Sequence, residues 1–206
     1  MFIVIDGTDG VGKSTQVKML ANYLRDEYKQ IVIELSEPTS ESDAGKAIRE
    51  AIKEGRRFEP IVEAAFFVED RCYDINNRIK PSLEAGKTVV LDRYYYSTVA
   101  YQSALGIPKE ELYEMHEHFI VEPDLVFILH CPVDIALERV NNRGEQDVME
   151  HREYQERVRK VFREFHSDHI FHVDAVKSAD EVHAEIIEHL KDFMELHNLR
   201  RKSKTN

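Results

Sequence analysis

The stretch Gly7-Thr-Asp-Gly-Val-Gly-Lys-Ser14 decides how this chain folds. It matches the pattern G-x-x-x-x-G-K-[ST], in which glycines let the backbone wrap closely around phosphate groups. The apolar run at residues 2–6 precedes it, and residues 14–28 follow with apolar side chains at helical spacing. A strand, a glycine-rich turn and a helix in this order are the context that the pattern requires. The stretch therefore predicts a phosphate-binding P-loop and the P-loop NTPase fold.

The predicted P-loop offers several contacts to a nucleoside triphosphate. Backbone N–H groups and the positive end of the following helix dipole face the phosphate oxygens. Lys13 can reach the β- and γ-phosphates, and the Ser14 hydroxyl can ligate Mg²⁺. The guanine-reading motifs N-K-x-D and T-K-x-D are absent from the sequence, which favours ATP. The predicted nucleotide contacts are Gly7, Thr8, Asp9, Gly10, Val11, Gly12, Lys13, Ser14 and Thr15.

Strand-like and helical segments alternate along the rest of the chain. After the first strand, we expect strands at residues 31–35, 88–91, 125–130 and 170–173. Helices are expected at residues 43–54, 61–85, 97–104, 109–119, 133–142, 152–166 and 179–197, with a kink or interruption at Pro81. Continuous apolar strands between helices predict an α/β fold with three α/β/α layers and a mainly parallel five-stranded sheet. The loops at 7–14, 36–42 and 92–96 should converge at the carboxyl ends of the strands.

Length and composition indicate one cytoplasmic domain. The 206 residues suit a single domain at 1–198, followed by a basic, flexible tail at 199–206. A net charge of −11 argues against nucleic acid as a partner. The apolar runs are too short to cross a membrane, and no signal peptide is expected at Met1. Cys72 and Cys131 are read as ordinary reduced thiols.

A second polar group follows the apolar strand at residues 88–91. Asp92 and Arg93 come directly after it, so both lie at the carboxyl end of a strand. Asp92 is placed to orient magnesium-bound water or to polarise an attacking oxygen, and we count it with Ser14 as a metal contact. Arg93 is placed to hold a second phosphate with its planar guanidinium. Alternatively, the two form a salt bridge at the strand end.

Five segments in this order resemble the thymidylate kinase family, and the resemblance covers most of the chain. They are Asp6-Gly-Thr-Asp-Gly-Val-Gly-Lys-Ser-Thr-Gln16, Phe67-Val-Glu-Asp-Arg71, Asp92-Arg-Tyr94 with Ser97, Ala100, Tyr101 and Gln102, Pro123-Asp-Leu-Val-Phe-Ile-Leu129, and Ala136-Leu-Glu-Arg-Val-Asn-Asn-Arg-Gly144. The resemblance implies transfer of the ATP γ-phosphoryl group to dTMP, with Mg²⁺ as cofactor. It also implies a homodimer.

The resemblance implies roles for individual residues on the acceptor side. Asp9 would approach the sugar 3′-hydroxyl, and Tyr101 would crowd the 2′ position. Phe67 would stack on the pyrimidine, Arg71 would hydrogen-bond its exocyclic oxygen, and Arg93 would hold the acceptor phosphate. The full set of implied acceptor contacts is Asp9, Glu37, Arg49, Phe67, Arg71, Arg93, Thr98, Tyr101 and Gln102. Ordinary alternatives are core packing for Phe67 and surface ion pairs of Arg71 with Glu69 or Asp70.

A lid at about residues 139–152 is also implied. One subset of the family carries a P-loop arginine where this chain has Gly10, and the other subset supplies a catalytic arginine from the lid. Gly10 therefore points to the lid, with Arg143 as the candidate and Arg139 and Arg152 as neighbours. Such an arginine would offset charge on the transferring phosphoryl group. The predicted catalytic set is Lys13, Asp92, Arg93 and Arg143.

The chain departs from the family pattern in two places. Where members often have Arg-Glu-Pro-Gly-Gly, it reads Ser36-Glu-Pro-Thr-Ser40, so Arg49 could replace the missing arginine. In the lid, Val148 stands where many lid-arginine members carry arginine.

Other functions remain open at the level of sequence. One rival is another deoxynucleotide or deoxynucleoside kinase, although the latter usually have Glu-Arg-Ser or Asp-Arg-Ser where this chain has Asp92-Arg-Tyr94. Another is a regulatory ATP-binding module without an acceptor substrate, and a third is a catalytically silent scaffold. Separately, His166, His169 and His172 are spaced by three, but they straddle a helix end and a strand, which favours packing roles over a metal site.

Overall fold

The computed structural model describes residues 1–141 and 152–204. Within them, five strands form one parallel sheet in the order β2-β3-β1-β4-β5. The strands are β1 Phe2–Gly7, β2 Val32–Ser36, β3 Thr88–Asp92, β4 Leu125–His130 and β5 Ile170–Asp174. The expected parallel five-stranded sheet is confirmed, and each strand lies within one residue of its predicted bounds.

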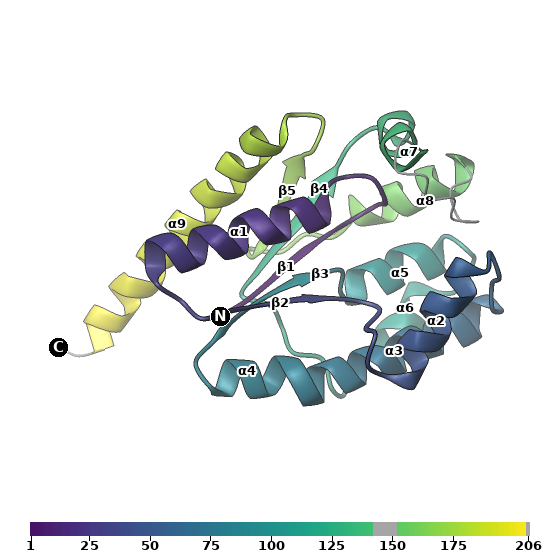
Figure 1. The fold of residues 1–206 in the computed structure, drawn as a ribbon, viewed down its shortest axis with the longest axis horizontal. Helices are drawn as coiled ribbons and strands as arrows, with labels where there is room; N and C mark the ends of the chain where they lie inside the picture. The colour runs from purple at the N-terminus through teal and green to yellow at the C-terminus, as the bar shows by residue number, and fades with distance from the viewer. Residues whose placement is uncertain (142–151, 205–206) are drawn as a thin grey trace.

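Helices cover both faces of the sheet, which makes the expected three layers (Figure 1). Helices α1 and α9 pack on one face, whereas α3, α5 and α8 pack on the other. The helices are α1 Lys13–Tyr28, α2 Asp43–Lys53, α3 Pro60–Asp74, the π-helical turn η1 Ile75–Ile79, α4 Lys80–Glu84, α5 Tyr95–Ser103, α6 Lys109–Glu114, α7 Val133–Asn141, α8 Arg152–Phe162 and α9 Ala179–Lys204. Helix α9 thus includes residues 199–204 of the predicted tail.

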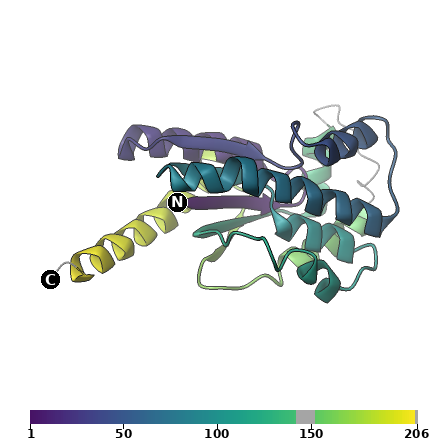
Figure 2. The same cartoon turned by 90° about the horizontal axis from the view of Figure 1, so that it is seen from below.

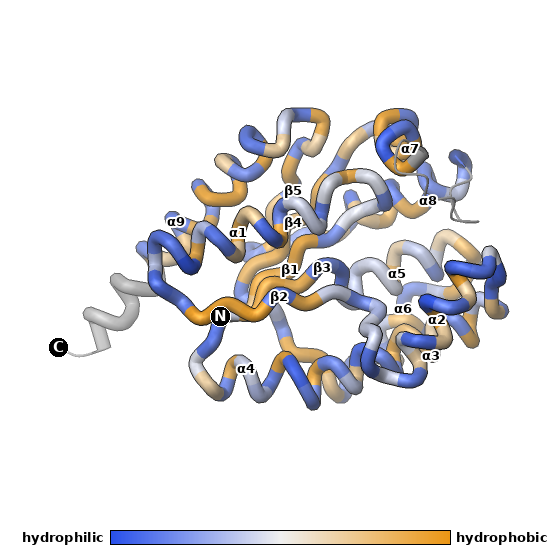
Figure 3. The backbone as a smooth tube through the Cα atoms, viewed as in Figure 1, coloured by the Kyte–Doolittle hydropathy of each residue, from blue (hydrophilic) through white to orange (hydrophobic). Residues whose placement is uncertain are grey.

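The sheet is apolar on both faces, as a parallel sheet between helix layers must be. Alternate residues of β1 enter opposite cores: Phe2 and Val4 pack toward α5 and α8, and Ile3 and Ile5 pack toward α1 and α9. Figure 3 shows this concentration of hydrophobic residues along the central strands. Among the described residues, no helix is long and apolar enough to cross a bilayer.

Helices α2, α3 and α5 gather beyond the carboxyl ends of the strands, at the same end as the P-loop (Figures 1 and 2). The loops after β1, β2 and β3 therefore lie next to these helices. This arrangement gives the expected convergence of the three loops a physical basis, because parallel strands all deliver their carboxyl ends to one edge.

The irregularity expected at Pro81 takes the form of the π-helical turn Ile75–Ile79, which divides the expected helix at residues 61–85 just before the proline. Two helix predictions need correction. The helices expected at 109–119 and 152–166 end at Glu114 and Phe162. Phe119 and Phe165 still pack on the core from the turns that follow, which explains why the apolar pattern outlasts both helices.

A buried carboxyl group lies where α3 meets the π-helical turn. Asp74 is fully buried, and the Nε of Arg78 is 3.2 Å from its Oδ1. Burial raises the pKa of Asp74 to about 6, and although Arg78 lowers it, the neighbouring Asp70 and Glu41 add to the rise. The folded protein therefore binds this proton more tightly than the unfolded chain does.

We expect this group to make stability fall as pH rises. The stabilising contribution is fully present below about pH 4 and is lost as pH passes through 6. In Asp74→Asn, the loss of unfolding free energy between pH 4 and 7 should shrink by about 2 kcal/mol. Urea denaturation across this range measures it, with the exposed Asp26→Asn as control. Equal pH dependence in wild type and Asp74→Asn would contradict the assignment.

Candidate functional site

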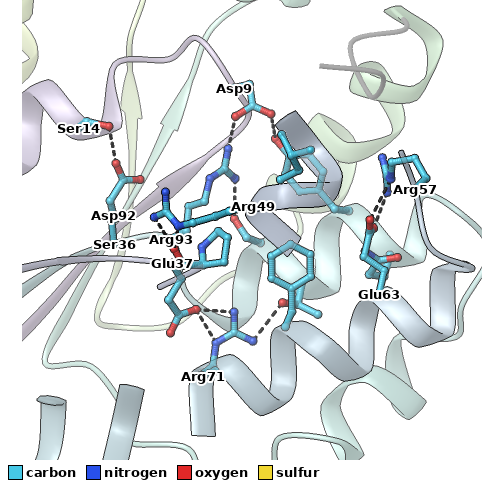
Figure 4. A pocket seen from close by; sticks show the side chains of 17 residues that line it. Asp9, Ser14, Ser36, Glu37, Arg49, Arg57, Glu63, Arg71, Asp92 and Arg93 are labelled. Atoms are coloured by element: carbon cyan, nitrogen blue, oxygen red, sulfur yellow. Dashed lines mark hydrogen bonds and ion pairs between the residues drawn. The ribbon is translucent and has the colours of Figure 1, made fainter. Parts of the chain in front are cut away.

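The three loops enclose a cavity of about 430 Å³ at the carboxyl ends of β1, β2 and β3 (Figure 4). The expected convergence of these loops is therefore confirmed. Every residue that the sequence assigned to the acceptor side lines this cavity. These residues are Asp9, Glu37, Arg49, Phe67, Arg71, Arg93, Thr98, Tyr101 and Gln102, and the cavity also includes Ser14 and Asp92.

The P-loop occupies one rim and has a backbone that requires glycine. Gly10 has φ of 77°, and a Cβ there would lie 2.2 Å from the carbonyl oxygen of Ala136 in α7. No side chain fits at position 10, so a P-loop arginine is sterically excluded there. Lys13 is buried, and its Nζ donates to the carbonyl of Thr8 at 2.7 Å. Burial and the nearby Arg93 lower the pKa of Lys13.

Asp6, at the end of β1, joins the P-loop to the start of α5. Its buried carboxylate accepts hydrogen bonds from the backbone N–H groups of Gly7, Tyr94 and Ser97 and from the Ser97 hydroxyl, at 2.6–3.1 Å. Burial raises the pKa of Asp6, while Arg93 acts against the rise. No role was predicted for Asp6 from the sequence, although an aspartate at the end of an apolar strand before a P-loop is a recognisable signal.

Ser14, in the first turn of α1, meets Asp92, the last residue of β3. The Ser14 hydroxyl donates to Asp92 Oδ2 at 2.6 Å. The other oxygen, Oδ1, is buried without a hydrogen-bond partner among the described residues. A hydroxyl and a carboxylate beside a phosphate cradle are suitable for Mg²⁺, which takes oxygen ligands. The unsatisfied Oδ1 is consistent with such a cation or with one of its water ligands.

Arg93 lies between the P-loop and the rest of the cavity. Its φ of 69° is unusual for a residue with a side chain and turns the chain sharply after β3. The guanidinium forms an ion pair with Asp9 and donates to Ser97 Oγ at 3.0 Å. The Tyr101 hydroxyl donates to the same Asp9 carboxylate at 2.9 Å. The Arg93 side chain remains 20% exposed, so it is still accessible from the cavity.

Arg71 forms the floor of the cavity and is held more firmly than the sequence suggested. It is 1% exposed, and Nε and Nη2 contact Glu37 Oε2 at 2.8 and 2.6 Å. Nη1 donates to Thr98 Oγ1 at 3.0 Å and to His116 Nε2 at 2.6 Å. The alternative of a surface pair with Glu69 or Asp70 is wrong, because the helix turns Arg71 inward. These contacts use four of the five guanidinium N–H groups, which leaves one on Nη2 for a ligand.

The far wall contains two charged residues that the sequence analysis missed. Arg57 forms a bidentate ion pair with Glu63, with Nε 2.9 Å from Oε1. The Gln102 amide Nε2 donates to Glu63 Oε2 at 2.7 Å. This contact fixes the amide orientation, and Gln102 Oε1 is left buried without a partner in the described structure. Phe67 lies half-buried on the same wall. No short motif marks Arg57 or Glu63.

The loop after β2 is positioned by Asp70, which was read only as part of a motif. Its carboxylate accepts from the Thr39 N–H and hydroxyl, both at 2.7 Å, and from the Ser42 hydroxyl. Helix α2 approaches so closely that a Cβ at Gly45 would lie 2.3 Å from Asp70 Oδ1. Thr39 and Ser42 thus hold the loop through their side chains. Arg49 donates to the Pro38 and Thr39 carbonyls, with Nε at 2.9 and 3.1 Å.

The predicted lid arginine, Arg143, and Val148 lie outside the described residues. Of the neighbouring candidates, Arg139 donates to the carbonyl of Ala175 at 2.8 Å. Arg152 forms an exposed ion pair with Asp134 at 2.9 Å. Neither lines the cavity. In the P-loop, Val11 is buried in the core and Thr15 is exposed.

His116 fixes the position of Arg71. Its Nδ1 donates to the carbonyl of Leu112 at 2.6 Å, so its Nε2 is free to accept from Arg71. Burial and the Arg71 charge lower the pKa of His116 to about 3, which keeps the ring neutral. No short sequence motif marks this contact.

His116→Ala should destabilise the fold by about 1–3 kcal/mol, because it leaves a buried guanidinium N–H without an acceptor. His118→Ala, an exposed neighbour, should change the unfolding free energy by less than about 0.5 kcal/mol. Chemical denaturation at neutral pH compares the two variants. Equal stabilities would show that His116 does not hold Arg71.

Comparisons with known proteins agree with this geometry. The family model for thymidylate kinase matches residues 5–186. The thymidylate kinase of Brachyspira hyodysenteriae is 38% identical over 92% of this chain and 93% of its own length. A probable thymidylate kinase of Archaeoglobus fulgidus is 37% identical over 95% of this chain and 97% of its own. A crystal structure of thymidylate kinase from Ehrlichia chaffeensis superposes with a TM-score of 0.75, at 28% identity, over 93% of this chain and 98% of that one. This chain therefore belongs to the thymidylate kinase family.

Proposed function

We propose that this protein transfers the γ-phosphoryl group of ATP to the phosphate of dTMP, giving dTDP and ADP. The observation that carries the proposal is the position of Arg93, which lies between the P-loop and a cavity of nucleotide size. A phosphate bound by Arg93 would lie next to the γ-phosphate held by Lys13. Little covalent chemistry is then asked of the protein, because positioning and charge compensation supply most of the acceleration.

The polar groups on the cavity wall match the hydrogen-bonding pattern of thymine. Arg71 has one N–H left, which suits the O4 acceptor of thymine, and Gln102 Oε1 has no partner, which suits the N3–H donor. Cytosine presents the opposite pattern at both positions. Phe67 offers an aromatic face for stacking, and Pro38 adds apolar surface to the same cavity.

Asp9, Arg93 and Tyr101, which contact one another, indicate where the sugar and the phosphate of the nucleotide would lie. Asp9 and Tyr101 line the cavity beside Arg93, where the sugar of a nucleotide would lie between base and phosphate. The Asp9 carboxylate can accept from the 3′-hydroxyl, and the Tyr101 ring occupies space that a 2′-hydroxyl would need. Although burial works against it, Arg93 and Lys13 lower the pKa of Asp9, so this carboxylate is ionised at neutral pH.

Ser14 and Asp92 would hold Mg²⁺. When bound, the cation would offset negative charge on the phosphate groups. The role of Arg143 and the homodimer stay predictions from the resemblance, and the cytoplasmic location stays a prediction from the sequence composition. The alternative functions differ from the proposed one in the acceptor that they need: another kinase would prefer a different acceptor, and the regulatory module would need none.

An acceptor panel tests the function. With ATP and Mg²⁺, ADP release should be fastest with dTMP and about 10–200-fold less efficient with dUMP, which lacks only the methyl group. With dCMP, kcat/KM should fall by about 10⁴-fold, because Arg71 and Gln102 would face the wrong hydrogen-bonding groups. AMP and thymidine should give no product. A lack of preference for dTMP would refute the substrate assignment, and ATP hydrolysis that no monophosphate stimulates would favour the regulatory module.

The metal assignment has its own test. Asp92→Asn should lower kcat by about 100-fold or more and raise the Mg²⁺ concentration needed for half-maximal rate. Asp26→Asn, already used as an exposed control, should leave both values unchanged. Isothermal titration of dTMP should show nearly normal binding in Asp92→Asn, which separates a metal defect from misfolding. An unchanged Mg²⁺ requirement would contradict the role of Asp92.

A further inference from the structure

A second cavity, of about 380 Å³, lies at the carboxyl ends of β4 and β5, next to α8. None of its lining residues in the described structure also lines the first cavity. Its polar lining consists of His130, Arg159, Arg163, His166, His172 and Asp174. In a chain of net charge −11, a cavity lined by two guanidinium groups and three imidazoles, with one carboxylate, is unusual.

Two of the imidazoles form a hydrogen-bonded chain. His172 Nε2 donates to the carbonyl of Phe165 at 2.8 Å, so its Nδ1 accepts from His130 Nε2 at 2.6 Å. The two rings are stacked with centroids 4.9 Å apart, and the His166 ring lies 5.1 Å from that of His172. His169, the third residue of the spacing noted in the sequence, contacts Ser167 instead. Among the contacts of the described residues, none uses His130 Nδ1, which is an acceptor while the ring is neutral and a donor once the ring is protonated.

This arrangement does not suit a cation. The ring nitrogens of His172 are both used, and no group of three potential metal ligands occurs among the described residues. Burial, His172, Arg163 and Arg159 lower the pKa of His130 to about 4, so its ring is neutral at pH 7. The positive charge of the cavity therefore comes from Arg159 and Arg163.

Within the described part of the chain, the two arginines have no strong partner. Arg159 Nε is buried with no hydrogen-bond partner in the described residues, and the nearest carboxylate contact of its guanidinium is Glu156 at 3.7 Å. Arg163 is exposed and forms no ion pair with any described residue. The carboxylate of Asp174 accepts from the Val176 N–H at 3.0 Å. A buried guanidinium N–H without an acceptor is unfavourable unless a ligand supplies one.

We propose that this second cavity binds a small tetrahedral oxyanion of the phosphate class. Arg159 and Arg163 would donate from their planar forks, the geometry best suited to such an anion. Protonated His130 would add a donor from Nδ1. The Asp174 carboxylate, at the end of β5, would repel the anion, so the ligand would lie on the side of the cavity nearer α8. The proposal does not depend on the acceptor assigned to the first cavity.

Sulfate is a suitable probe, because it remains a dianion between pH 5 and 8. With both nucleotide sites filled by ADP and dTMP, the melting temperature of the full chain should rise saturably with sulfate at constant ionic strength. Arg159→Gln/Arg163→Gln should weaken the apparent affinity at least about tenfold. Lys160→Gln, an exposed position on the same helix with the same charge change, should not. Inorganic phosphate should compete with sulfate, and a nucleotide that competes instead would mark the site as part of the donor site.

A second measurement uses the unaltered protein. Bound sulfate adds negative charge beside His130, so the pKa of this group should rise and sulfate should bind several-fold more tightly at pH 5 than at pH 8. Nitrogen-15 histidine spectra with and without sulfate follow the titration directly. The proposal is overturned if no saturable response occurs, if the double variant responds like Lys160→Gln, if ADP and dTMP abolish the response, or if the His130 titration is unchanged.

Discussion

The ion pair between Arg93 and Asp9 is the interaction on which the site depends. It joins the loop after β3 to the loop after β1, and it exists because β1 and β3 are neighbours with Ile5 opposite Asp92. The Arg93 N–H donates to the Ile5 carbonyl at 3.0 Å, which extends the ladder by one step before the chain turns. The left-handed backbone conformation at Arg93 then directs its side chain toward the P-loop. Strand order thus brings the Arg93 guanidinium to the P-loop, where the proposed phosphate transfer requires it.

Charge pairing explains how an acidic protein keeps a cationic site stable without a ligand. Arg93 pairs with Asp9, Arg71 with Glu37, and Arg57 with Glu63. A buried guanidinium without a partner would be strongly destabilising, so each of these three guanidinium groups lies next to its own carboxylate. Arg93 remains partly exposed to the cavity, whereas Arg71 is buried. Among the described residues, Arg159 and Arg163 form no comparable pair, which distinguishes the second cavity from the first.

The sequence predicted the parts of the structure that depend on local pattern. Apolar runs located the strands, and the P-loop motif located the turn between β1 and α1, because both signals lie within a few consecutive residues. Partners brought together by the fold could not be predicted in this way. The contacts of Asp6 with Ser97, of Arg71 with His116 and of Glu63 with Gln102 join segments 39–91 residues apart. The π-helical turn before Pro81 was missed for a related reason, since the apolar spacing alone does not reveal a change in helix width.

The most direct test of the account is a crystal structure of the protein with dTMP and a non-hydrolysable ATP analogue. The account predicts that the dTMP phosphate contacts Arg93 while the γ-phosphate contacts Lys13, with the attacking oxygen aligned opposite the leaving oxygen. A complex in which dTMP leaves the Arg93–Asp9 pair untouched and places its phosphate elsewhere would contradict it.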